Sequence, residues 1–74
     1  MSAEYVVVIE KSETGFGAYV PDLPGCVAVG ESREETLRLV REAIELHLVS
    51  LREAGEPVPL PTSTAERVSV HVAA

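Results

Sequence analysis

Carboxylate side chains are the residues of this 74-residue sequence best suited to chemistry, and metal-dependent hydrolysis is the first reaction to consider. A nuclease of that type needs several carboxylates that converge on a metal pair, commonly with one in the middle of a central strand. The most strand-like segment has valine at positions 6–8, whereas Glu10, Glu13 and Asp22 fall at strand ends or in loops. We therefore expect no metal site, no catalytic residue and no enzymatic activity.

The two histidines and the single cysteine form no recognisable site. His47 and His71 lack the close spacing of paired zinc ligands, and neither has a nucleophile at a recognisable distance. Cys26 is the only cysteine, so neither an intrachain disulfide nor a cysteine-based zinc site can form. We expect Cys26 to be a small buried residue in a reducing compartment, and we expect no cofactor.

The charge of the chain argues against nucleic-acid binding. Six Lys and Arg against twelve Asp and Glu give a net charge of -6 at pH 7, which opposes a phosphate backbone. The segment Gly15-Phe16-Gly17 lacks the third glycine and the following helix of a phosphate loop. The N-terminus has no basic signal-peptide region, and no apolar run approaches the roughly 20 residues that span a bilayer. We expect a cytoplasmic protein that binds neither nucleic acid nor membrane directly.

Three short strands are predicted in the first thirty residues. Residues 5–9 are β-branched or aromatic and apolar on both faces, and further strands are expected at residues 16–20 and 26–29. The first hairpin loop is Ser12–Gly15, where we expect Gly15 to adopt a positive φ. Together these strands predict an antiparallel meander.

A long helix is predicted from Ser32 to Ala54. Ser32 and Glu35 form a capping box, and Gly55 ends the helix. The apolar stripe of this helix consists of Leu37, Val40, Ile44, Leu48 and Leu51. Leu39 and Leu46 widen the stripe to roughly half the circumference of the helix. They are either the ragged edge of a small core or a contact for a partner, and we retain both as candidate partner-binding residues.

The last segment combines alternating prolines with alternating valines. Pro57, Pro59 and Pro61 predict an extended connector, and the valines at 68, 70 and 72 are typical of a strand with one buried face. A strand that follows a helical crossover normally returns parallel. We therefore predict an α+β fold in a single domain over residues 1–74: β-β-β-α-β, an antiparallel meander plus one parallel strand, with one helix on one face.

One face of this sheet is left without cover. A single helix shields one face, yet the first strand is apolar on both faces. An apolar face open to water favours association, so we expect a homo-oligomer, dimer or higher, or a complex with another protein.

The loop between the second and third strands is a second candidate contact. It consists of Pro21, Asp22, Leu23, Pro24 and Gly25. Its two prolines reduce the entropy that the loop loses on docking, and Asp22 is its best functional candidate. A purely architectural role for the loop is the alternative.

Three stretches of the sequence together resemble the HicB family of antitoxins. They are residues 15–26, which contain Pro-Asp-Leu-Pro-Gly-Cys, then Gly30-Glu31-Ser32, and finally Gly55-Glu56-Pro57-Val58-Pro59. The resemblance covers nearly the whole chain. It implies a partial ribonuclease H-like fold without the catalytic carboxylates of that fold. It also implies a partner, a small basic HicA-like ribonuclease toxin with a catalytic histidine.

The resemblance implies inhibition by occlusion rather than by chemistry, and the acidic charge of the chain suits a cationic toxin. Many relatives carry a C-terminal DNA-binding domain, whereas this sequence ends two residues after Val72. We therefore expect no such domain and no autorepression by this protein alone. The alternative hypothesis is an orphan HicB-like oligomeric protein that binds another protein or a ligand and has no toxin partner.

Overall fold

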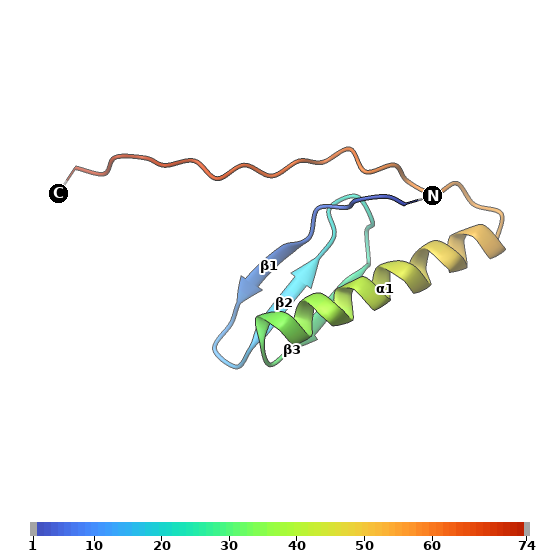
Figure 1. Cartoon of the computed structure of the whole chain (residues 1–74), viewed down its shortest axis with the longest axis horizontal. Coiled ribbons are helices and arrows are strands. Elements are labelled where there is room, and N and C mark those ends of the chain that lie inside the picture. Colours follow the sequence, from blue (N-terminus) through green and yellow to red (C-terminus); the bar gives the residue numbers. More distant parts are fainter. Residues whose placement is uncertain (1, 74) are drawn as a thin grey trace.

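A three-stranded antiparallel sheet packs against one long helix in the computed structural model, which describes residues 2–73 (Figure 1). The elements are β1 (Val8–Lys11), β2 (Phe16–Tyr19), β3 (Val27–Gly30) and α1 (Arg33–Glu53). The strand order is β1-β2-β3, and both pairings are antiparallel. The predicted α+β class, with an antiparallel meander followed by a helix, is confirmed.

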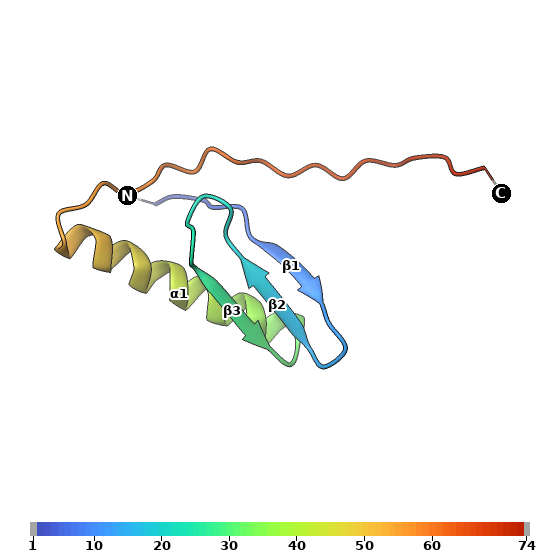
Figure 2. The same ribbon diagram turned by 180° about the vertical axis from the view of Figure 1, so that it is seen from behind.

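The register of the sheet sorts its side chains onto two faces. Ile9, Ala18 and Ala28 lie opposite one another across the strands and belong to the core or pack against it. Tyr19 and Val27 form the next cross-strand pair after Ala18 and Ala28. Because successive residues of a strand alternate between faces, the side chains of Tyr19 and Val27 point to the opposite face. Figures 1 and 2 show α1 on one side of the sheet only. The prediction that a single helix covers a single face is confirmed.

The hairpin between β1 and β2 closes where the sequence predicts, but for a different reason. The backbone N–H of Ser12 donates to the carbonyl of Gly15 over 2.8 Å. The prediction of a positive φ at Gly15 is wrong, since within residues 2–73 only Gly25 and Gly55 have one. A Cβ at Gly15 would collide with the carbonyl oxygen of Gly30. Glycine is therefore required here by close approach of the two chain segments.

Both ends of α1 are capped by local hydrogen bonds. The hydroxyl of Ser32 accepts from the N–H of Glu35 over 3.0 Å, and the Glu35 carboxylate accepts from the N–H of Glu31 over 2.9 Å. At the other end Gly55 has a φ of 71°, and its N–H donates to the carbonyl of Arg52. Together with a bond from Glu56 to Leu51, this forms a Schellman motif. The predicted start and end of the helix are confirmed.

The core is small and lies between the sheet and the first half of α1. Its buried residues are Ala18, Val20, Leu23, Cys26, Thr36 and Val40. Close contact of α1 with the sheet depends on Gly30, because a Cβ there would lie 2.6 Å from the Thr36 hydroxyl oxygen. The helix, about 31 Å long at 1.5 Å per residue, extends well past the four-residue strands. Much of its second half therefore has no sheet beneath it.

Residues 5–7 are extended, but β1 begins only at Val8, later than the sequence predicts. Val8 pairs with Tyr19, the last residue of β2. Beyond Tyr19 the chain turns into the loop that leads to β3, so residues 5–7 have no strand beside them. The edge of β1 thus continues towards the N-terminus as unpaired, half-buried extended chain.

The predicted parallel fourth strand is not confirmed, and neither is the ribonuclease H-like part of the fold. Residues 57–73 are extended but belong to no helix or strand. Val68, Val70 and Val72 are 77%, 75% and 80% exposed. The prolines do hold the connector extended, but the segment after Ser63 runs away from the sheet instead of joining it (Figure 1). We refer to residues 64–73 as the tail.

Candidate protein-binding surfaces

Two consecutive turns form the loop between β2 and β3. Backbone hydrogen bonds of 3.0 Å close the turns at residues 20–23 and 23–26. Pro21 and Pro24 each occupy the second position of a turn, where their fixed φ is favourable. Gly25 has a φ of 85° and occupies the third position of the second turn, as a type II turn requires. The order of prolines and glycine in the sequence thus specifies the loop conformation.

The five candidate residues of this loop differ in exposure. Leu23 is fully buried, so its side chain attaches the loop to the core rather than to a partner. Pro21, Pro24 and Gly25 are exposed. Cys26, directly after the loop, is buried as expected, and its burial raises the pKa of the thiol. The loop is therefore a fixed element that presents Pro21 and Pro24 to solvent.

Asp22 holds the start of the C-terminal segment. Its carboxylate accepts backbone N–H bonds from Thr62 (3.0 Å) and Ser63 (2.9 Å), and it also accepts from their hydroxyls (3.1 and 2.8 Å). These donors, above all the backbone N–H of Ser63, lower the pKa of Asp22 below its ordinary value of 3.8. Nearby, the Tyr5 hydroxyl donates to the carbonyl of Pro59 over 2.6 Å. The best functional candidate of the loop thus makes an intrachain contact across forty residues.

The face of the sheet opposite α1 carries large apolar side chains. Val27 and Val29 are 60% and 76% exposed, and Tyr19 is also exposed. Gly17, paired with Val29, leaves open space, since a Cβ there would meet nothing within 4 Å. Glu10 of β1 also pairs with Gly17, so it lies on the same face as Val29 and adds a negative charge there. We call this surface, formed by Tyr19, Val27 and Val29, the bare face.

The flank of α1 with Leu39 and Leu46 is partly open to solvent. Leu39 is half-buried, and Leu46 is 72% exposed. At about 100° per residue, these two side chains lie on the opposite side of the helix from Leu37 and Ile44. Leu37 and Ile44 face the N-terminal segment, so Leu39 and Leu46 lie on the side of β3. The structure therefore places this flank next to the outer edge of the sheet.

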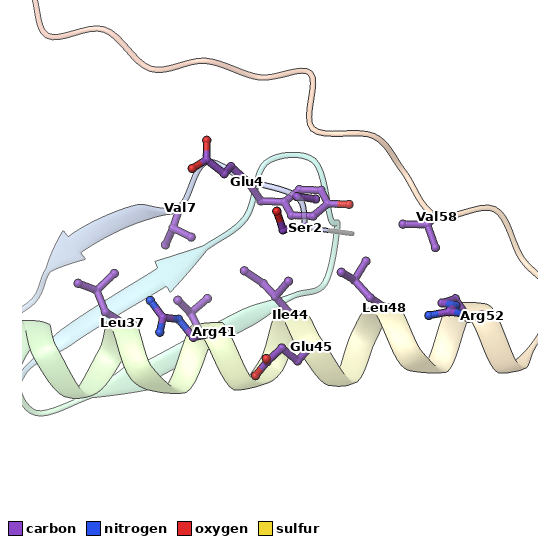
Figure 3. Close-up of a pocket in the computed structure, with 13 residues that line it drawn as sticks. Ser2, Glu4, Val7, Leu37, Arg41, Ile44, Glu45, Leu48, Arg52 and Val58 are labelled. Carbon is purple, nitrogen blue, oxygen red and sulfur yellow. The ribbon is translucent and has the colours of Figure 1, made fainter.

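An open groove of about 1200 Å³ lies between α1 and the N-terminal residues 2–7 (Figure 3). Its apolar walls are Tyr5, Val7, Leu37, Val40, Ile44, Leu48 and Val58. Charged residues at its borders are Glu4, Arg41, Glu45 and Arg52. The sequence does not predict this groove. Its walls come from the N-terminal segment, the helix and Val58 of the connector, and only the folded chain brings them together.

No metal-binding cluster was found among residues 2–73: nowhere do three His, Cys, Asp or Glu side chains lie close enough together to hold an ion. In the same part of the chain, α1 is too polar to cross a membrane.

A comparison with protein-family models identifies the family. The model described as "HicB_like antitoxin of bacterial toxin-antitoxin system" matches residues 5–71. The chain belongs to the HicB-like antitoxin family. The family resemblance seen in the sequence is confirmed.

Individual relatives of this HicB-like chain include short proteins of similar length. A UPF0150 protein of Helicobacter pylori is 59% identical over 49 residues, covering 66% of this chain and 67% of the relative. A UPF0150 protein of Thermoplasma acidophilum is 38% identical over 69 residues, covering 92% and 97%. "Antitoxin HicB 2" of Photorhabdus laumondii is 31% identical over 62 residues, covering 84% of this chain but 45% of the relative.

The fold is also found in a solved complex. A chain of the "HicA3 and HicB3 toxin-antitoxin complex" matches this HicB-like chain with a TM-score of 0.69 and 32% identity. The match covers 81% of this chain and 70% of the other. The arrangement of sheet and helix described above is therefore also found in a chain of a toxin-antitoxin assembly.

Proposed function

We propose that this chain neutralises a small basic HicA-like ribonuclease by binding it through the bare face of the sheet. The observation that carries the proposal is the exposure of Tyr19, Val27 and Val29 on one contiguous face of a HicB-like antitoxin. A monomer of this size gains nothing for its own stability by leaving these side chains in water. Their burial against a second protein explains their presence.

The bare face continues into the other candidate contacts. The loop of Pro21, Pro24 and Gly25 joins Tyr19 to Val27 and therefore borders this face. Because β3 is an edge strand, the flank of α1 with Leu39 and Leu46 lies next to the bare face, on the other side of this edge. A toxin that covered all three parts would contact every exposed residue selected from the sequence. Asp22 and Leu23 would hold the loop in place through their intrachain contacts and would not themselves contact the toxin.

Charge supports a cationic partner. The chain carries a net charge of -6, and Glu10 lies on the bare face itself. Opposite charge accelerates the encounter of two proteins and disfavours uncharged or acidic competitors. An acidic protein bound to the basic surface of a ribonuclease would exclude RNA from it. In this proposal the antitoxin acts in the cytoplasm by occlusion alone, with no catalytic step.

Co-expression of His-tagged chain with a HicA-like protein encoded beside its gene tests the proposal. We expect the wild type to co-purify with the toxin and to rescue growth. Val29→Lys places a positive charge on the bare face and should abolish capture, weakening binding by about 100-fold or more. Its melting temperature should stay within a few degrees of the wild type, because Val29 is exposed.

Ala54→Lys is the matched control, since it adds the same charge at the exposed end of α1 and should leave capture intact. If Val29→Lys captures and neutralises the toxin as well as Ala54→Lys does, the bare face is not the binding surface. If the wild type captures no HicA-like protein, the antitoxin function itself is contradicted, and the orphan hypothesis replaces it.

A further inference from the structure

The tail has the pattern of a strand but no strand beside it. Val68, Val70 and Val72 are each at least three-quarters exposed and alternate with Ser69 and His71. Such an alternation buries one row of side chains when the segment pairs with a sheet. In this chain the tail runs along the 55 Å long axis of the molecule and away from the sheet (Figure 1). The apolar row is left without cover.

The body of the chain offers a site of matching length. The outer edge of β1 is unpaired within the described chain, and it continues through residues 5–7, so that residues 5–11 form one extended edge. Seven residues of tail, 66–72, are as long as this edge, about 23 Å at 3.3 Å per residue. The apolar groove lies beneath the same edge, between residues 2–7 and α1.

The groove also matches the tail in its chemistry. A strand added to the edge of β1 would lie over the flank of α1 that carries Leu37, Ile44 and Leu48. Figure 3 shows these side chains pointing up from the helix towards the N-terminal segment. Each of these three side chains remains partly exposed, because in the described chain the sheet ends at β1. Valines at every second position of an added strand would cover them.

We propose that the occupant of this groove is the tail of a second copy of the chain. Each chain of the dimer would place Val68, Val70 and Val72 in the groove of the other, and the tail backbone would pair with the free edge of β1. Because one chain carries both the tail and the groove, the exchange closes as a two-fold symmetric dimer. Ser69 and His71 would then point to the opposite face of the extended sheet.

The anchors of the connector favour exchange over docking within one chain. Tyr5 holds Pro59, and Asp22 holds Thr62 and Ser63 through four hydrogen bonds. These contacts set the direction in which the tail leaves its own body, and the tail then runs away from α1 and the N-terminal segment (Figure 1), whose side chains line the groove. The fourth strand expected from the sequence would thus be completed between two chains.

Light scattering on the purified chain without any toxin tests the proposal. We expect a dimer at micromolar concentration. Val70→Asp places a charge in the apolar groove and should raise the dimer dissociation constant by about 100-fold or more. Ser69→Asp is the matched control, since it puts the same charge on the other side of the strand and should leave the dimer intact. A wild-type monomer, or equal effects of both variants, would overturn the proposal.

Disulfide trapping separates exchange from intrachain docking. Two variants with one added cysteine each, Ile44→Cys and Val70→Cys, carry tags of different length and are mixed and oxidised. Cys26 is buried and should not compete. We expect a disulfide between the two different chains, and a much weaker product when Ser69→Cys replaces Val70→Cys. A double variant that carries both Ile44→Cys and Val70→Cys tests docking within one chain. If only this variant cross-links, and only within a single chain, the tail docks on its own body. Since no toxin is present, neither result depends on the antitoxin function.

Discussion

The two faces of the sheet differ in the space around their side chains. On the face covered by α1, Ala18, Ala28 and Gly30 are small, and a Cβ at Gly30 would already meet Thr36. On the bare face, the residues in adjacent positions of the same strands are Tyr19, Val27 and Val29. The covered face has little space, whereas the bare face has large apolar groups that no element of the described chain covers (Figure 2). Folding accounts for the first set of residues, and the proposed binding of a partner would account for the second.

This comparison predicts that stability and binding can be separated by mutation. Substitutions on the covered face change the free energy of unfolding, because every atom there has a close neighbour. Substitutions on the bare face change association and leave unfolding nearly unaffected.

Leu23→Ala should cause the largest loss. Leu23 is fully buried in a core of few residues, so its truncation leaves a cavity and should lower the free energy of unfolding by about 2–5 kcal/mol. Urea denaturation followed by circular dichroism measures this change. A loss below about 1 kcal/mol would mean that the loop can collapse onto the core, contrary to its assignment as a fixed element.

Gly30→Ala and Gly17→Ala test the two faces directly, since both add one methyl group to a central or neighbouring strand. At Gly30 the new Cβ would lie 2.6 Å from the Thr36 hydroxyl oxygen and 3.0 Å from its backbone nitrogen. We expect a loss of about 1–3 kcal/mol from the forced separation of sheet and helix. At Gly17 nothing lies within 4 Å, so the change should stay within about 0.5 kcal/mol. Equal losses in thermal unfolding would refute the distinction between the faces.

Ser32→Ala tests the N-terminal cap of α1, the helix that covers one face of the sheet. The variant loses the acceptor for the N–H of Glu35, and it should lower the free energy of unfolding by about 1 kcal/mol. Chemical denaturation measures the loss. Ser32→Asp is the control, because an aspartate at this position also accepts the bond and should retain most of the stability.

Acid should release Thr62 and Ser63, at the start of the C-terminal segment, from Asp22. Hydrogen bonds from Ser63 and Thr62 favour the ionised carboxylate of Asp22 and lower its pKa in the folded state. The contribution of this anchor is therefore fully present above the ordinary value of 3.8 and is lost as the pH falls through the lowered pKa. The amide chemical shifts of Thr62 and Ser63 should titrate below pH 3.8, and Asp22→Asn should remove that titration. A midpoint at or above 3.8 would contradict the assigned hydrogen bonds.

Local features of the fold could be predicted from neighbouring residues. The cap at Ser32, the Schellman motif at Gly55 and the turns of the Pro-Asp-Leu-Pro-Gly loop depend on residues within five positions of each other. The fit of Gly15 against Gly30 could not be predicted in the same way, because two distant segments create it. The role of Asp22 was missed for the same reason, although the neighbouring hydroxyls of Thr62 and Ser63 were a possible signal.

The sequence by itself determined the first three strands, the helix and their order, the acidic charge and the family, because these depend on local conformational preference, side-chain periodicity and composition. Only the tertiary structure decided where the last segment lies and what Asp22 binds. A segment of alternating valines forms a strand only where it can pair with the free edge of a sheet. Which edge it pairs with depends on residues far away in the sequence. The groove beneath residues 5–7 likewise exists only after α1 has packed on β2 and β3, because packing of the helix brings its walls together.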